Sequence, residues 1–262
     1  MNIIKFDKLC NCDIIEHGFS TRRGGVSKGI FESMNLGFNR GDDEENVKEN
    51  FRIISKALNM PYENIVLSAQ THTTNIRIVT EEDKGKGIII PRDYENVDGL
   101  ITNIKQIPLV TFYADCVPLL LFDPVKKVIA SSHSGWRGTV NRMGKITIEK
   151  MVEVFGCEPV NIIACIGPSI CKDCYEVNAD VARAFMEEFA DYGYENIVFP
   201  KENDKYLIDL WEANRVILKM AGIIDDNIEI SGTCTCCNKE LLFSHRATNG
   251  MRGNLAAFIM LK

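Results

Sequence analysis

Two residues able to bind metal or act as nucleophile and base stand beside apolar runs near the middle of the chain. Cys116 directly precedes the run from Val117 to Phe122, and His133 directly follows the run from Val128 to Ser132. The dipeptide Asp123-Pro124 between these runs is a turn signal and predicts an antiparallel hairpin. In such a hairpin the thiol and the imidazole emerge at the same open end.

A third candidate ligand is His72, which lies among hydroxyl side chains at the expected end of a strand. Two imidazoles and one thiolate suit zinc, with a fourth coordination position open for water or substrate. No short spacing requires His72, Cys116 and His133 to converge. An alternative is a nucleophilic Cys116 with His133 as its base, which needs a thiolate free of metal.

A second group of cysteines occupies the last hundred residues. Cys171-x-x-Cys174 together with Cys234-x-Cys236 is a possible four-thiolate zinc site. The spacing of the second pair is irregular, and a domain of this size needs no metal to fold. We therefore expect these cysteines, Cys237 and Cys165 to be buried or adventitious thiols and not a second zinc site.

Several other residues could bind an anion or a flat ring. Arg22 and Arg23 precede Gly24-Gly25 in a glycine-rich segment, where cations and free backbone N–H groups favour anion binding. An equally good interpretation of this segment is a surface loop with solvated arginines and no bound anion. Trp136 and Arg137, just after His133, add an apolar face and a fixed cation.

Composition limits the classes of function. The chain has 262 residues, 45% hydrophobic and 25% charged, which is ordinary for a globular protein. Its net charge of −6 argues against nucleic-acid binding. Because we find neither a membrane-spanning apolar run nor a secretory signal, we expect a cytoplasmic protein without a membrane partner and with reduced cysteines.

Hydrophobic periodicity predicts helices and strands in an irregular order. Apolar residues at three- and four-residue steps predict helices after Asp43, over 143–155, from about Asn178, and over 210–220. Strands are expected over 65–79, 227–230 and 254–260, and a loop that wraps a site over 17–43. No linker divides the chain, so we expect one α+β domain over residues 1–262 with mixed or antiparallel sheets.

Several motifs together resemble the laccase-domain family, labelled multicopper polyphenol oxidase, whose members resemble purine nucleoside phosphorylases. They are HGFSTRRGGVS, NLG with GDD, SAQTH, YADCVPLLLFDP, HSGWRGT, IGPSI with YEV, and GTCTC with FSHR. The pair YADC and HSGWRGT is the most specific. The resemblance extends from His17 to about Ala257. Thr73 and the ending FSHRATNGMRGN depart from the family's usual pattern.

The resemblance implies a four-layer α-β-β-α fold and a zinc ion held by His72, Cys116 and His133. It also implies phosphorolysis of adenosine, inosine, guanosine and methylthioadenosine, with deamination of adenosine. We assign catalytic roles to Cys116, His133, Asp115 and Arg137, with Asp115 orienting a ligand or accepting a proton. The remaining side chains assigned to phosphate or nucleoside binding are Arg22, Arg23, Trp136, Phe112 and His245.

Other functions remain open from the sequence. One branch of the family resembles peptidoglycan editing factors, and the same zinc or Cys–His site would serve such a hydrolase. A non-catalytic zinc-binding protein is another alternative. A true multicopper oxidase is disfavoured, because four histidines, none paired as His-x-His, are too few for four coppers. We expect a small-molecule substrate and a monomer or small homo-oligomer.

Overall fold

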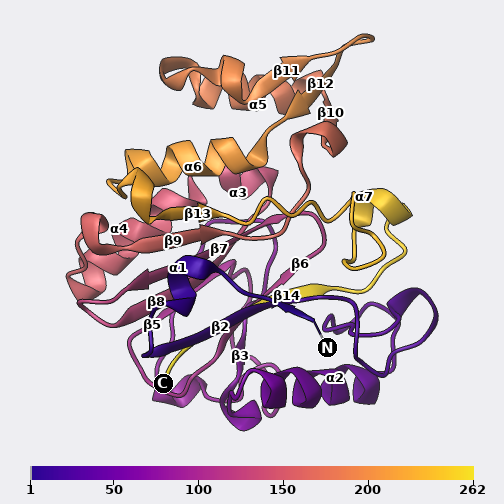
Figure 1. Cartoon of the computed structure of the whole chain (residues 1–262), viewed down its shortest axis with the longest axis vertical. Helices are drawn as coiled ribbons and strands as arrows, with labels where there is room; N and C mark the ends of the chain where they lie inside the picture. Colours follow the sequence, from indigo (N-terminus) through magenta and orange to yellow (C-terminus); the bar gives the residue numbers. More distant parts are fainter. Residues whose placement is uncertain (1) are drawn as a thin grey trace.

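The computed structural model describes residues 2–262 and contains two β-sheets stacked face to face between helices (Figure 1). The five-stranded sheet has the order β1 (Ile3–Ile4), β2 (Ile15–Ser20), β14 (Leu255–Leu261), β6 (Leu109–Tyr113), β3 (Val66–Leu67). The six-stranded sheet has the order β13 (Ile228–Ile230), β9 (Ile163–Ile166), β7 (Val117–Asp123), β8 (Val128–Ser134), β5 (Gly99–Thr102), β4 (Ile76–Ile78). Both sheets mix parallel and antiparallel pairs, as expected.

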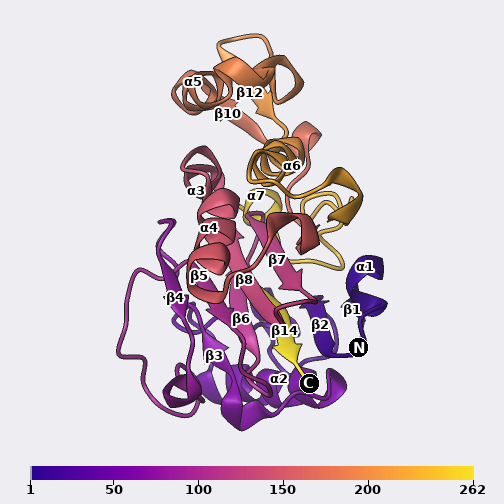
Figure 2. The ribbon, with the colours of Figure 1, turned by 90° about the vertical axis from the view of Figure 1, so that its left-hand side faces the viewer.

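Helices cover the outer face of each sheet. α2 (Glu44–Ala57) lies against the five-stranded sheet and begins at Asp43, whose side chain accepts a hydrogen bond from the Glu45 N–H. On the other side α4 (Met143–Phe155) and α6 (Leu210–Met220) cover the six-stranded sheet (Figure 2). Shorter helices are α1 (Asp7–Cys10), α3 (Trp136–Val140) and α7 (His245–Thr248).

Successive side chains of β7 point to opposite faces of the sheet and pack into two different hydrophobic cores. Leu119 and Leu121 pack with residues of α4 and α6, such as Ile148 and Ile217. Leu120 and Phe122 point to the opposite face and pack between the two sheets. A third core lies between the five-stranded sheet and α2. The result is an α+β fold of four layers, α-β-β-α, with mixed sheets.

A small unit that the sequence analysis did not anticipate lies outside these layers. Its three strands have the order β10 (Glu176–Asn178), β12 (Lys205–Ile208), β11 (Val198–Pro200), and α5 (Ala179–Glu188) packs on them. Figures 1 and 2 show this unit beyond α6. Among residues 2–262, no helix has both the length and the apolar content needed to cross a membrane.

Most of the expected elements form where the periodicity placed them. The helices over 143–155 and 210–220 have the expected bounds. Residues 65–79 form two short strands, β3 and β4, in different sheets. The loop expected over 17–43 begins later, because residues 17–20 belong to β2, where residues 17–19 pair with β14. There His17 is buried, and its Nε2 accepts a hydrogen bond from the Phe6 N–H.

Candidate metal centre and its cleft

The three candidate ligands of the central hairpin converge. β7 and β8 pair antiparallel with Pro118 opposite His133, so that Cys116 and His133 meet at the open end of the hairpin. The ligand atoms of His72, Cys116 and His133 all lie within 4.8 Å of one another. The Cys116 Sγ lies 3.9 Å from the His72 Nε2. The predicted convergence of these three side chains is therefore confirmed.

Asp98 fixes both histidines and was missed by the sequence analysis. Its Oδ1 accepts hydrogen bonds from the His133 Nδ1, at 2.8 Å, and from the His72 N–H, at 3.0 Å. Its Oδ2 accepts from the N–H groups of Thr71 and Thr73. These bonds hold His72 in a left-handed conformation with φ 65°. They also leave the His133 Nε2 as the free ligand atom, an arrangement typical of metal-binding histidines.

The sheet topology explains why Asp98 can do this. It directly precedes β5, which runs antiparallel to β8 with Gly99 opposite Ser132. The start of β5 therefore lies beside the end of β8, and the His133 N–H donates to the Asp98 carbonyl at 2.8 Å. The signal in the sequence was an acidic residue at the start of a strand, in the run VDGLIT. It identifies Asp98 only once the strand order is known.

Gln70 fixes the loop that carries His72. Its side-chain N–H donates to the Phe112 carbonyl at 2.8 Å, and its Oε1 accepts from the Phe112 N–H at 2.6 Å. These two hydrogen bonds pair the loop with β6 as the backbone of an additional strand residue would. The SAQTH motif therefore combines an anchor, Gln70, with a ligand, His72.

The electrostatics of the centre favour a thiolate. Burial raises the pKa of Cys116, but His133 and His72 outweigh burial and lower it to about 6. Burial lowers the pKa of His133, but Cys116 and Asp98 outweigh burial and raise it to about 9. These opposite pKa shifts favour a Cys116 thiolate beside a protonated His133. The thiolate is the form of cysteine that binds metal or attacks a carbon.

Gly135 gives the ligands the space they need. A Cβ at this position would lie 3.0 Å from the His72 Cδ2 and 3.1 Å from the Cys116 Sγ. Few real Cβ atoms come so close to a neighbour, so a side chain here would push the ligands apart. This contact explains the glycine of the HSGWRG motif in physical terms.

The three ligands lie at the wall of an open cleft of about 990 Å³. Pockets of roughly 300–1,000 Å³ accommodate small organic ligands. The half-buried Phe112 also lines the cleft, as expected for a side chain that stacks on a flat ring. Tyr94, Arg40 and Arg252, which the sequence analysis did not assign, line it as well.

Arg252 has an unusual environment for a guanidinium. Its Nε is buried and has no hydrogen-bond partner among residues 2–262. Burial, and then the nearby Arg40, lower its pKa to about 10. Two cations close together on a cleft wall, one of them with an unused donor, favour an anionic ligand.

The sequence-assigned arginines lie elsewhere. Arg22 donates hydrogen bonds to the carbonyls of Glu32 and Lys239, both at 2.9 Å. Arg23 lies 3.9 Å from Glu240 in an exposed ion pair. Arg137 stacks over Trp136 with its guanidinium carbon 4.3 Å from the ring centre. The cleft-lining residues include none of these four assigned side chains, Arg22, Arg23, Trp136 and Arg137.

Asp115 connects the metal centre to the C-terminal part of the chain. Its carboxylate accepts hydrogen bonds from the Thr235 hydroxyl, at 2.6 Å, and from the Arg246 N–H, at 2.7 Å. It adopts a left-handed φ of 92° next to Cys116. This geometry fits the orienting role considered for Asp115. His245 lies beside Arg246 at the start of α7 and is largely exposed; partial burial and then Arg252 lower its pKa.

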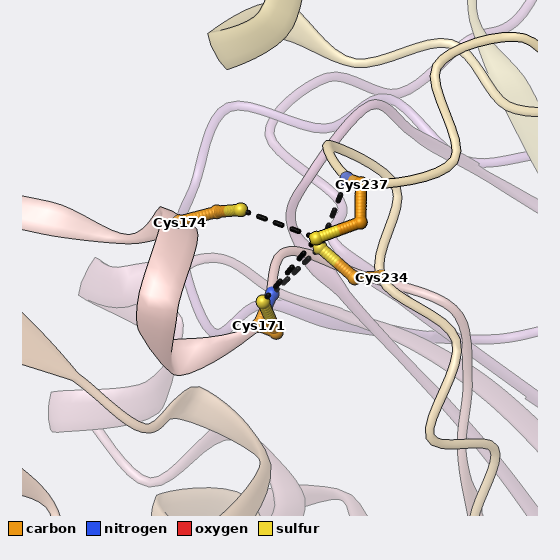
Figure 3. Close-up of side chains that lie close together, drawn as sticks. All are labelled: Cys171, Cys174, Cys234 and Cys237. Carbon is orange, nitrogen blue, oxygen red and sulfur yellow. Dashed lines mark hydrogen bonds between the residues drawn. The ribbon is translucent and has the colours of Figure 1, made fainter.

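Four of the other cysteines, expected to be buried or adventitious thiols, come together in the structure. The sulfur atoms of Cys171, Cys174, Cys234 and Cys237 lie within 4.8 Å of one another (Figure 3). The reason is topological, because β9 and β13 are parallel neighbours and the segments that follow them leave the sheet at the same edge. Cys165 lies apart, buried in β9, and burial raises its pKa well above the usual range.

The family model described as multi-copper polyphenol oxidoreductase laccase matches residues 16–262. The chain therefore belongs to this laccase-domain family, as its motifs indicated.

Relatives and solved structures agree with this membership. The purine nucleoside phosphorylase YlmD of Bacillus subtilis is 37% identical over 94% of this chain and 88% of its own. The adenosine deaminase RL5, from an unknown prokaryotic organism, is 34% identical over 93% of this chain and 94% of its own. The crystal structure of the hypothetical protein YfiH of Bacillus licheniformis superposes with a TM-score of 0.89. That structure is 32% identical and covers 95% of this chain and 93% of its own.

Proposed function

We propose that this chain is a zinc-dependent purine nucleoside phosphorylase with adenosine deaminase activity. Its substrates would be adenosine, inosine, guanosine and methylthioadenosine. The observation that carries the proposal is the joint opening of the His72–Cys116–His133 centre and the Arg252 guanidinium onto one cleft. The names of the relatives, purine nucleoside phosphorylase and adenosine deaminase, support the same chemistry.

The ligand set fits zinc on chemical grounds. Two imidazoles and one thiolate are borderline-to-soft donors, and three protein ligands leave one position open. His72, Cys116 and His133 would hold the ion. Zinc held there would supply a Lewis acid able to lower the pKa of water. Asp98 keeps the proton on the His133 Nδ1 and thereby directs Nε2 toward the ligand position.

Phosphorolysis needs a bound phosphate and a positioned nucleoside. Phosphate oxygen attacks the anomeric carbon, the bond to the purine nitrogen breaks, and the purine leaves with a proton. Arg252 and Arg40 would bind the phosphate, the role expected from the sequence for Arg22, Arg23 or Arg137. Phe112 would stack on the purine. The predicted contributions of Arg137, Trp136 and His245 remain proposals.

Deamination uses the same cleft without phosphate. Water adds at the carbon that carries the adenine amino group, and ammonia leaves. The two reactions therefore differ in whether the arginine pair is used. This difference makes them separable by mutation.

The test is a turnover assay with purified protein. Inosine and adenosine are incubated with and without inorganic phosphate, and base, pentose 1-phosphate and ammonia are measured. We expect phosphate-dependent release of base, lost in His133→Ala and retained in Arg23→Gln. Zinc content should fall by one ion per chain in Cys116→Ala. Zinc that stays bound in a Cys116→Ala, His133→Ala double variant at the wild-type amount would contradict the assigned ligands.

Copper oxidase chemistry is tested in the same preparation. After copper loading and removal of weakly bound ions, we expect no substantial oxidation of phenols. Robust phenol turnover with stoichiometric copper, and no base released from any nucleoside, would overturn the proposed function.

A further inference from the structure

Four thiols outside the cleft form a compact cluster. Cys171 and Cys174 lie in the segment after β9, and Cys234 and Cys237 lie in the turn after β13 (Figure 3). The Cys174 and Cys237 sulfurs are 3.4 Å apart, and the Cys171 and Cys237 sulfurs are 4.0 Å apart. All four sulfur atoms lie within 4.8 Å of one another.

These separations match one tetrahedral metal ion. Four sulfurs at the usual zinc–sulfur bond length lie about 3.8 Å from one another. A disulfide needs about 2.0 Å between its sulfurs, much less than the 3.4 Å between Cys174 and Cys237. An iron–sulfur cluster places several irons and sulfides between its cysteines, so their sulfurs would lie farther apart than in a one-ion site.

The backbone around Cys234 supplies a second, independent feature. The Cys171 and Cys237 N–H groups both donate hydrogen bonds to the Cys234 Sγ, at 3.3 Å each. Such donors stabilise a sulfur that carries negative charge, as a metal-bound thiolate does. Thiols alone would not require two amides to point at the same sulfur.

The spacing of the cysteines gives a third line of support. Cys171-Lys-Asp-Cys174 and Cys234-Thr-Cys-Cys237 are both C-x-x-C pairs, and two such pairs are a common zinc-binding pattern. Pairing Cys234 with Cys236, as expected from the sequence alone, hides this regularity. Cys236 instead packs against the hydrophobic core between the six-stranded sheet and its helices.

We propose that Cys171, Cys174, Cys234 and Cys237 hold a structural zinc ion, separate from the cleft. Four protein ligands complete the coordination and leave no position for water or substrate. Binding of one Zn²⁺ releases the four thiol protons to solvent. The ion joins the segments after β9 and β13 into one rigid unit.

This unit lies against the residues that support the cleft. Thr235, inside the second C-x-x-C pair, donates to Asp115, the neighbour of the ligand Cys116. Arg246 donates to the carbonyls of Cys174 and Glu176, both at 2.9 Å. The ion would therefore position the C-terminal wall of the site without contacting substrate.

The test counts and characterises metal in the full-length protein. Protein is produced with zinc and purified under a thiol reductant, and its metals are measured by elemental analysis and native mass spectrometry. We expect two zinc ions in the wild type and one in Cys116→Ala. Cys174→Ser and Cys237→Ser should each lose one ion, whereas the matched control Cys236→Ser should retain both.

A spectroscopic measurement tests the cluster without replacing any of its four cysteines, so it does not depend on cluster variants that fail to fold. Zinc X-ray absorption of Cys116→Ala should show four sulfur neighbours at about 2.3 Å and no nitrogen. If the cleft held no metal, the wild type would hold one ion with this same four-sulfur shell, so failure at one site is distinguishable from failure at the other.

Three results would overturn the proposal. They are Cys116→Ala protein without zinc, iron in place of zinc, and a disulfide between these cysteines in protein kept under reductant throughout.

Discussion

The cleft centre and the four-cysteine cluster are built from similar residue types for opposite purposes. In the cleft, His72 is exposed, His133 is buried, and the supporting partner is a carboxylate, Asp98. In the cluster, all four donors are thiols and the supporting partners are backbone N–H groups directed at Cys234.

The two sites differ in whether they leave a coordination position open. Three ligands and an open wall suit chemistry on a bound substrate, whereas four ligands with no open position suit rigidity. A carboxylate behind a histidine adjusts its tautomer and orientation, so it affects reactivity. Backbone donors have no titratable proton of their own, and at Cys234 they stabilise a sulfur that carries negative charge. The two centres should therefore respond differently to the same perturbation.

Metal removal should give the largest effect. A mild chelator should remove the ion of the cleft first, because one of its ligands, His72, is exposed and a coordination position is open. We expect turnover to be abolished while the melting temperature hardly changes; a stronger chelator should then lower the melting temperature. Activity, zinc content and thermal unfolding are followed together. Simultaneous loss of activity and fold would contradict the division of roles.

Asp98→Ala should be the most damaging single substitution outside the ligands. It removes the partner of the His133 Nδ1 and of three successive backbone N–H groups around His72. Loss of such a supporting carboxylate costs about 10- to 100-fold in metal affinity or activity, and here it supports two ligands. We expect kcat/KM to fall about 100-fold, with the four-cysteine ion retained. Loss of the cluster ion in this variant would show that the centres are coupled.

Arg252→Gln should separate the two proposed reactions. Charge-assisted hydrogen bonds contribute about 1.5–3 kcal/mol, so KM for phosphate should rise about 10- to 100-fold. Deamination of adenosine should hardly change, because it uses no phosphate. Arg22→Gln is the matched control, since Arg22 bonds backbone carbonyls away from the cleft. Equal loss of both reactions in Arg252→Gln would assign the arginine to nucleoside binding or to folding instead.

Gly135→Ala should have the smallest of these effects. The new methyl would press on the His72 ring and the Cys116 sulfur at 3.0 and 3.1 Å, so we expect about a tenfold loss of cleft zinc affinity. Gly138→Ala is the matched control, because its Cβ would meet neighbours only at 3.4 Å or more. Competition with a zinc indicator measures both variants. Equal affinities in the two would show that the Gly135 contact is unimportant.

The sequence predicted the secondary-structure elements and the candidate metal ligands better than it predicted the residues that surround and position those ligands. The helix over 143–155 and the convergence of Cys116 with His133 follow from local periodicity and from one turn. Asp98 and the four cysteines depend instead on which strands are neighbours, β5 with β8 and β9 with β13. Strand order is a long-range property that local patterns do not encode. Arg252 could not be assigned from the sequence because its buried, unpaired Nε is visible only once its surroundings are known.

The position of β14 has a consequence for how the chain acquires its structure. β14 is the central strand of its sheet, between β2 and β6, so residues from opposite ends of the chain pair there, such as Ala257 with Phe19. Closing so long a loop is entropically costly, and pairings of this kind slow folding. Until β14 inserts, β2 and β6 each present an unpaired edge on which a second chain could add a strand. A lower growth temperature and a slower expression rate should therefore raise the yield of native protein.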